Sequence, residues 1–220
     1  MSRQSDRSSS EGRVGESTRE RILSVALDLF TRKGYEAASL REIADELGFS
    51  KAALYYHFSS KQEILLALHM RLHDLGDRYL LPLLRGEGGA GDPWLRAVDK
   101  LIELGLQNRK LIEVNVRNQE AIAEIHRHPT VKGHARPAAD SEALLLGLLT
   151  DRSLPPELRV RRIATLGAVS GVVFAATQLS DVPNARIEDA LRALVRDVLG
   201  VASPRGAVVR RGAGQARRHR

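Results

Sequence analysis

The segment from Ser39 to Lys61 constrains the fold of this chain more than any other, because it is typical of two short helices joined by a tight turn. Ser39 and Glu42 have the spacing of a capping box, in which the serine accepts a backbone amide and the glutamate reaches back. Gly48 stands where the first helix can end in a left-handed residue without steric cost. Ser50 can then cap a second helix. This order of helix, glycine turn and helix predicts a helix-turn-helix, whose second helix enters the major groove of DNA.

The second helix carries side chains suited to a DNA surface. Leu54 and Phe58 are four residues apart and are expected to face inward. Lysine can donate to guanine and a methyl group can touch thymine, whereas hydroxyl and imidazole groups can hold phosphates. We therefore predict base contacts by Lys51, Ala52, Ala53 and Tyr56, and phosphate contacts by Ser39, Ser50, Tyr55, His57 and Lys61. Arg41 is a further predicted DNA-binding residue. The alternative is a surface helix whose tyrosines pack on a neighbouring domain.

Residues 18 to 64 resemble the N-terminal DNA-binding domain of the TetR family of transcriptional regulators. The matching pieces are Arg21-Ile22-Leu23, Ala26-Leu27-x-Leu29-Phe30, Lys33-Gly34-Tyr35, Ser39-Leu40-Arg41-Glu42-Ile43-Ala44 and the run from Gly48 to Lys61. The resemblance covers about a fifth of the chain. The rest is similar to the family only in its length and its all-helical pattern. It implies a homodimer on a palindromic operator in double-stranded DNA, and a small-molecule effector bound in a C-terminal helical bundle.

The order of apolar, capping and breaking residues predicts an all-α chain of about nine helices, with no convincing strand. Two further capping boxes, at Ser17 and Ser60, are expected to begin the first helix and a long fourth helix that ends before Pro82. Later helices are expected near residues 93–108, 110–127, 137–149, 156–179 and 185–199. The predicted organisation is a disordered arm (1–16), a helix-turn-helix domain (17–63), a ligand-binding and dimerisation domain (64–200) and a disordered Arg-rich tail (201–220).

The composition limits the classes of function. The chain has no Cys, which excludes disulfides and thiolate metal sites, and no run of about 18 apolar residues that would predict a membrane span. Its N-terminus has no apolar stretch typical of a secretory signal. We find no glycine-rich phosphate loop, metal-ligand cluster or Ser/His/Asp arrangement, so we expect no enzyme activity, no metal and no cofactor. A cytoplasmic protein is the resulting expectation.

The net charge of +7 gives little support of its own to DNA binding. The tail from Val201 contributes six arginines and no acidic residue, whereas residues 18–61 hold seven basic and six acidic residues, a net charge of about +1. The prediction of DNA binding therefore depends on where the side chains lie. A ligand-independent regulator, or a nucleoid-type protein whose Arg-rich tail adds nonspecific affinity, is the alternative.

The last two helices carry a pattern that favours close helix packing. Small residues recur at spacings of three and four in the penultimate helix, and glycine inside a helix costs about 1 kcal/mol relative to alanine, which suggests a packing need. We predict that these two helices pair with their two-fold mates in a dimer. The alternative is packing inside the same bundle. The predicted interface residues are Ala164, Gly167, Ala168, Gly171, Ala175, Leu191, Leu194 and Val198.

The effector pocket is less well determined by the sequence. Large apolar side chains could form its walls, and amides in apolar helices usually need partners. The predicted pocket residues are Trp94, Asn115, Asn118, Phe174 and Gln178, with Tyr79, Leu104 and His126 as further candidates. Three histidines between residues 126 and 134 could suggest a metal, but the proline among them favours a surface loop.

Overall fold

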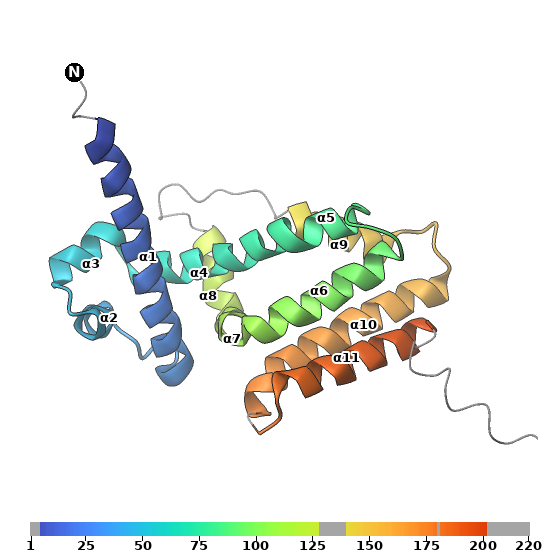
Figure 1. The fold of residues 1–220 in the computed structure, drawn as a ribbon. Coiled ribbons are helices and arrows are strands. Elements are labelled where there is room, and N and C mark those ends of the chain that lie inside the picture. Colours follow the sequence, from blue (N-terminus) through green and yellow to red (C-terminus); the bar gives the residue numbers. More distant parts are fainter. Residues whose placement is uncertain (1–4, 128–139, 180, 202–220) are drawn as a thin grey trace, which may run out of the picture.

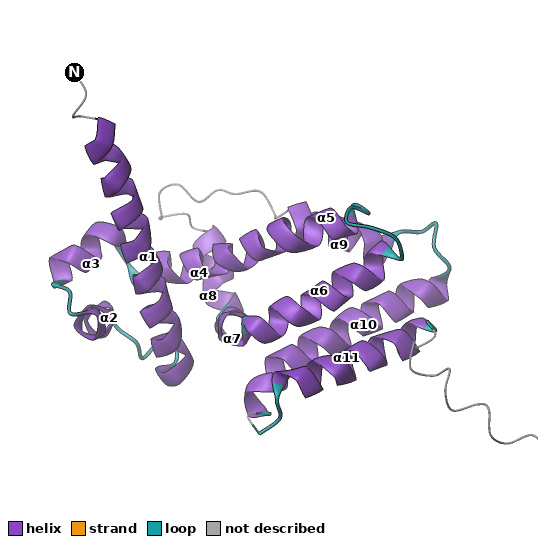
Figure 2. Ribbon diagram, viewed as in Figure 1, coloured by secondary structure: helices purple, strands orange, loops and turns teal. Residues whose placement is uncertain are grey.

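The computed structural model describes residues 5–127, 140–179 and 181–201, and all regular structure within these ranges is helical, as the sequence predicted (Figures 1 and 2). The N-terminal half contains α1 (Ser5–Lys33), α2 (Leu40–Leu47), α3 (Lys51–His57) and α4 (Lys61–Leu75), followed by a π-helical turn, η1 (Gly76–Leu80), and α5 (Leu81–Leu84). The rest of the chain contains α6 (Pro93–Gln107), α7 (Arg109–Arg117), α8 (Gln119–Arg127), α9 (Asp140–Thr150), α10 (Pro156–Ala175), a 3₁₀ turn, η2 (Ala176–Gln178), and α11 (Asn184–Leu199).

Helix α1 begins earlier than the sequence predicted. It starts at Ser5, so the expected capping box at Ser17 lies inside the helix and residues 5–16 of the expected disordered arm are helical. No proline interrupts residues 5–33. Since each added residue of an existing helix gains one hydrogen bond, a helix can extend through such a segment without a strong apolar pattern.

The fourth helix continues past the proline that was expected to end it. After α4 the backbone widens into the π turn η1, and Pro82 lies in the first turn of α5. Proline lacks an N–H and its ring clashes with the carbonyl four residues earlier in an α-helix. A π turn directly before it changes that register, which allows the helical path to reach Leu84.

The single helix expected over residues 110–127 is divided into α7 and α8. Asn118, between them, has φ −117° and ψ 24°, and its side-chain Nδ2 donates to the Val114 carbonyl at 2.7 Å. Asn108 makes the same arrangement between α6 and α7, where its Nδ2 donates to the Leu104 carbonyl at 2.9 Å. Asparagine side chains compete in this way with helical backbone bonds, and this local competition broke a pattern that looked continuous in the sequence.

Two hydrophobic cores stabilise the chain. The first contains side chains from α1 to α4 together with Leu111 and Val114 of α7 and Ile122 of α8. The second is formed mainly by α6, α10 and α11. Each fully buried large apolar side chain contributes roughly 1.5–3 kcal/mol. Helices α7 and α8 are thus packed into the same core as the N-terminal helices, although they lie within the C-terminal half of the sequence.

Helix α4 leads from the N-terminal helices into the C-terminal bundle, as Figure 1 shows. It contacts α1, α7, α8 and η1. None of the helices in the described ranges combines the length and the apolar character that a membrane span requires.

Candidate nucleic-acid interface

The caps predicted for the helix-turn-helix are present. The Ser39 hydroxyl accepts from the Glu42 amide at 3.3 Å, and Glu42 Oε2 accepts from the Ser39 amide at 2.9 Å, which completes the capping box of α2. Gly48 has φ 68°, the left-handed conformation expected at the end of α2. Ser50 then caps α3, because its hydroxyl accepts from the Ala53 amide at 3.1 Å. These local interactions fix the turn between α2 and α3.

Helix α3 has one buried and one exposed face. Leu54 and Phe58 are fully buried in the first core, as the four-residue spacing predicted. The opposite face is exposed, and Tyr56 on it is 86% accessible. The other residues predicted to meet DNA from α3 are Lys51, Ala52, Ala53 and Tyr55, which are exposed, and His57, which is half-buried.

Arg19 of α1 holds the end of α3, a role that the sequence did not reveal. Its Nη1 donates to the His57 carbonyl at 2.7 Å, and its guanidinium lies 3.9 Å from the centre of the Phe58 ring. Its Nη2 also lies 3.7 Å from a carboxylate oxygen of Glu63 in α4. Glu63 in turn accepts from the Ser59 amide at 2.8 Å. One guanidinium therefore connects α1, the end of α3 and the start of α4.

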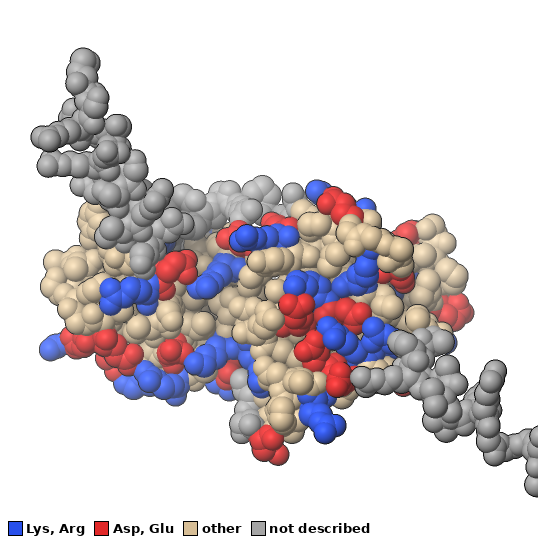
Figure 3. All heavy atoms as spheres, in the orientation of Figure 1, with Lys and Arg blue, Asp and Glu red and all other residues tan. Residues whose placement is uncertain are grey.

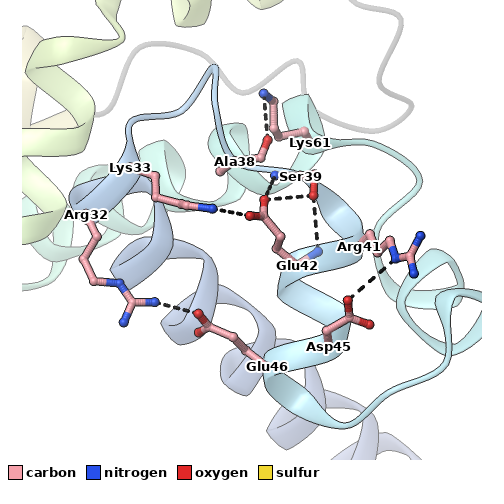
Figure 4. A network of polar contacts seen from close by, with 9 residues as sticks. All are labelled: Arg32, Lys33, Ala38, Ser39, Arg41, Glu42, Asp45, Glu46 and Lys61. Carbon is pink, nitrogen blue, oxygen red and sulfur yellow. Dashed lines mark hydrogen bonds and ion pairs between the residues drawn. The ribbon is translucent and has the colours of Figure 1, made fainter.

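Lys61 has a different environment from the one predicted for a phosphate contact. Its Nζ donates to the backbone carbonyls of Tyr35, Glu36 and Ala38 at 2.6, 3.1 and 3.1 Å; Figure 4 shows the last of these bonds. An ammonium group has three donors. All three point to the loop between α1 and α2 in this structure, so the Lys61 side chain supports that loop.

Ion pairs also join α1 to α2 (Figure 4). Arg32 pairs with Glu46 at 2.6 Å, and Lys33 pairs with Glu42. The hydrogen bonds from Lys33 and from Ser39 lower the pKa of Glu42 to about 2. Arg41, one of the predicted DNA contacts, extends into solvent with its side chain 85% exposed, at 3.7 Å from Asp45.

The face in Figure 3 carries basic and acidic side chains interspersed over both halves. No large single-sign field is visible on it, in agreement with the near balance of charges in residues 18–61. Specific contacts from α3 therefore matter more for DNA recognition than bulk attraction.

The predicted dimer residues divide into exposed and buried positions. Ala164, Gly167, Gly171 and Ala175 are exposed on α10. A Cβ on either glycine would meet nothing within 4 Å apart from adjacent residues and the backbone of its own helix. The small residues are therefore not required by packing within the described chain. Leu194 on α11 is exposed, and Ala168 and Val198 are half-buried. Leu191 is only 2% exposed and belongs to the second core, so its prediction as an interface residue is wrong.

A cavity of about 340 Å³ lies where the end of α4, η1 and α5 meet α6. Of the residues expected in an effector pocket, Trp94 and Leu104 line this cavity, whereas Asn115, Asn118, Phe174 and Gln178 do not. Phe174 and Gln178 are exposed at the end of α10 and in η2. The sequence pattern missed most of the lining, which comes from Leu72, His73, Leu75, Gly76, Leu80, Leu84, Ala97, Val98, Leu101, Gly105, Ile112, Leu145 and Leu166.

Asn115 is buried beside the cavity in a polar network with two histidines. Its Nδ2 donates to the Leu111 carbonyl at 2.7 Å, which leaves its Oδ1 to accept from His69 Nδ1 at 2.9 Å. His69 Nε2 in turn lies 2.9 Å from Nε2 of His73. His126, a predicted pocket candidate, instead contacts the His69 ring. In the part of the chain that the structure describes, no group of three or more histidines and carboxylates is placed to hold a metal ion.

Comparisons with known proteins agree with this geometry. The family model for "Bacterial regulatory proteins, tetR family" matches residues 22–68. Over 49 residues the chain is 47% identical to the "Uncharacterized HTH-type transcriptional regulator YerO" of Bacillus subtilis, which covers 22% of this chain and 17% of that protein. Over 53 residues it is 49% identical to the "HTH-type transcriptional activator FasR" of Mycolicibacterium smegmatis, which covers 24% of each. The chain thus aligns with a quarter or less of the length of these two relatives.

Solved structures match over most of the chain. AmtR of Mycobacterium smegmatis has a TM-score of 0.59 and 26% identity, over 84% of this chain and 87% of that one. The TetR family regulator PfmR of Thermus thermophilus has a TM-score of 0.62 and 24% identity, over 83% of this chain and 99% of that one. Residues 22–68 therefore match the tetR family of bacterial regulatory proteins in sequence, and the chain as a whole shares the fold of solved structures that include a TetR family regulator.

Proposed function

We propose that this protein is a sequence-specific DNA-binding transcriptional regulator that places α3 in the major groove. The observation that carries the proposal is the exposed face of α3, where Lys51, two alanines and two tyrosines surround a buried Leu54. Small side chains let the helix approach base edges, and the hydroxyl groups and lysine reach bases or phosphates. The face is rigid, because α3 is capped by Ser50 and held at its end by Arg19.

The regulator acts as a homodimer on a palindromic operator. The supporting observation is the exposed apolar stripe on α10, which includes Val160, Ile163, Gly167, Gly171 and Phe174. An exposed stripe of this kind is typical of a protein–protein interface. A two-fold dimer would bring one α3 to each half-site, about one helical turn of DNA or a multiple of it apart.

The DNA is released when a small molecule binds in the 340 Å³ cavity. The cavity touches Leu72 and Leu75 at the end of α4, and the start of the same helix packs into the core that also buries Leu54 of α3. A ligand that fits only one position of α4 would shift the population toward that position. A change of a few ångströms between the two α3 helices would prevent simultaneous contact with both half-sites.

We propose that the protein acts in the cytoplasm and as a repressor. Among its relatives, IcaR of Staphylococcus aureus is a "negative transcriptional regulator", whereas FasR is an "activator". Repression is the simpler mode, since a dimer bound over a promoter blocks it without a further contact to the transcription machinery.

The test is a binding assay of the purified full chain on its own upstream promoter DNA and on scrambled DNA, at physiological salt. Strong preference for the promoter, saturating at one or two dimers, supports the proposal. Equal and strongly salt-dependent binding to both DNAs, lost when residues 202–220 are deleted, would favour the nucleoid-type alternative instead.

A further inference from the structure

The wall of the cavity has an unusual composition. Of the residues that line it, His73 alone carries a titratable side chain, and none is an aspartate, glutamate, lysine or arginine. The remaining lining side chains are aliphatic or glycine, apart from the indole of Trp94. A volume of about 340 Å³ lies within the range typical of small-molecule sites.

An ionised ligand would be poorly accommodated by this wall. Moving a carboxylate or ammonium group from water into apolar surroundings is strongly unfavourable unless a partner of opposite charge is present. His73 is the one lining residue that could carry a positive charge, and no lining residue can carry a negative one. The cavity therefore selects against cations, and discriminates against anions unless His73 is protonated.

The hydrogen bond between His73 and His69 requires no charge on either ring. Since Asn115 Oδ1 accepts from His69 Nδ1, a neutral His69 has its lone pair on Nε2, and His73 Nε2–H is the donor between the two rings. This chain of bonds ends at the Leu111 carbonyl and is satisfied with both rings uncharged. The network fixes His73 at the cavity wall without requiring a proton that would attract an anion.

Trp94, one of the lining residues, has a buried indole N–H without a hydrogen-bond partner among the described residues. The residue is 2% exposed. Buried indole N–H groups usually find a partner. A ligand that carries one neutral oxygen could supply that acceptor after a small adjustment of the ring, whereas a pure hydrocarbon could not.

We infer that the cavity takes a neutral, mainly hydrocarbon small molecule with a single hydrogen-bonding oxygen. This inference rests on the proposed function in one respect, because it concerns the cavity that we propose as the effector site. The ligand seats its apolar part against Leu75, Leu80 and Leu101, between η1 and α6. Because Gly76 and Leu80 of the π turn line the cavity, the ligand contacts the segment that follows α4 directly.

The experiment uses the fluorescence of Trp94, which is the only tryptophan in the chain and lines the cavity. The full chain is titrated with 1-hexanol, 1-heptanol and 1-octanol, and with hexanoate and octanoate at a pH where both acids are ionised. We expect saturable changes for the alcohols, with affinity rising about threefold to fourfold per added methylene. We expect each carboxylate to bind at least about tenfold more weakly than the alcohol of equal length.

Two phenylalanine substitutions on α6 provide a matched pair. Leu101→Phe reduces the space inside the cavity, whereas Leu95→Phe changes a similarly half-buried leucine that does not line it. We expect Leu101→Phe to weaken octanol binding by about tenfold or more and Leu95→Phe to leave it unchanged, with helical circular dichroism retained in both. Three results would overturn the inference. Octanoate could bind as well as octanol, the two variants could lose octanol affinity equally, or no alcohol could change the fluorescence.

A parallel assay on promoter DNA separates this inference from the proposed function. Octanol that binds in the cavity without changing DNA affinity would support the ligand class and contradict its role as an effector site. Promoter-specific DNA binding in a protein that binds none of the alcohols would contradict the ligand class and leave the DNA-binding proposal intact.

Discussion

The Lys61 ammonium donates to the Tyr35 carbonyl at 2.6 Å and lies 4.3 Å from the centre of the Tyr35 ring, so the first residue of α4 is fastened to the loop that follows α1. The same ammonium also donates hydrogen bonds to the carbonyls of Glu36 and Ala38. These carbonyls lie just before α2, where the capping box of Ser39 begins. The lysine thus positions the helix-turn-helix relative to α4.

Lys61→Met should therefore lower the stability of the protein. The substitution keeps most of the aliphatic stem but removes the charged donor from three carbonyls in a site where the lysine side chain is 20% exposed. Loss of charge-assisted hydrogen bonds of this kind costs about 1–3 kcal/mol. Urea unfolding followed by circular dichroism measures the change.

Arg41→Met is the matched control for Lys61→Met, because Arg41 is a basic residue of the same domain whose side chain is 85% exposed. We expect its free energy of unfolding to change by less than about 0.5 kcal/mol. If Lys61→Met kept the wild-type stability and lost only DNA affinity, the lysine would be a phosphate contact, as its place in the sequence first indicated.

Glu42 should give the stability of the protein a dependence on acid pH. Hydrogen bonds from Lys33 and Ser39 lower its pKa from 4.5 to about 2 in the folded state. The stabilisation is complete above the unfolded pKa and is lost as the pH falls from about 4.5 through about 2, since protonation then becomes favourable first in the unfolded chain.

The measurement compares the urea midpoints of the wild type and Glu42→Gln at several pH values in that window. Glutamine keeps an acceptor for the capping box but cannot ionise, so the difference between the two proteins should shrink as the pH falls. Glu87→Gln, in an exposed loop, serves as the control and should follow the wild type. A constant difference between wild type and Glu42→Gln would contradict the assignment.

Local signals predicted the DNA-binding helices well, because their boundaries depend on neighbours in sequence. The caps at Ser39 and Ser50, the left-handed Gly48 and the buried Leu54 all follow from spacings of two to four residues. The start of α1 was missed, since helix extension needs no such signal. The break at Asn118 was missed because its cause is one side-chain bond to Val114.

The cavity lining could not be predicted in the same way. It is formed by residues from α4, η1, α5, α6, α7, α9 and α10. The sequence does not indicate how helices that far apart along the chain align against one another. Asn115 was expected to face a ligand because buried amides need partners, but its partners are His69 and the Leu111 carbonyl. Phe174 was expected in a wall, yet α10 turns it outward.

The exposed face of α3 should divide DNA recognition between two kinds of residue. Tyr55→Phe removes one hydroxyl and should weaken binding to operator and to random DNA by similar factors, because phosphate contacts carry no sequence information. Lys51→Ala should cost about 1–3 kcal/mol on the operator and less on random DNA, since it removes a base contact. Competition binding with both DNAs at fixed salt measures the two factors. Equal losses on both DNAs for the two variants would contradict this division.

The exposed stripe of α10 should control dimerisation, and Ile163→Glu is the direct test. Ile163 is 54% exposed in the single chain, so a glutamate there does not disturb its core, but in a dimer it would bury an unpaired charge on both sides of the two-fold axis. We expect the dimer dissociation constant to rise by about a hundredfold or more, measured by sedimentation, with operator affinity falling in parallel. Leu146→Glu changes a similarly exposed residue, 61% accessible on α9, and should leave both quantities unchanged. A dimer that survives Ile163→Glu would move the interface away from this stripe, and the exposed glycines of α10 would then need another explanation.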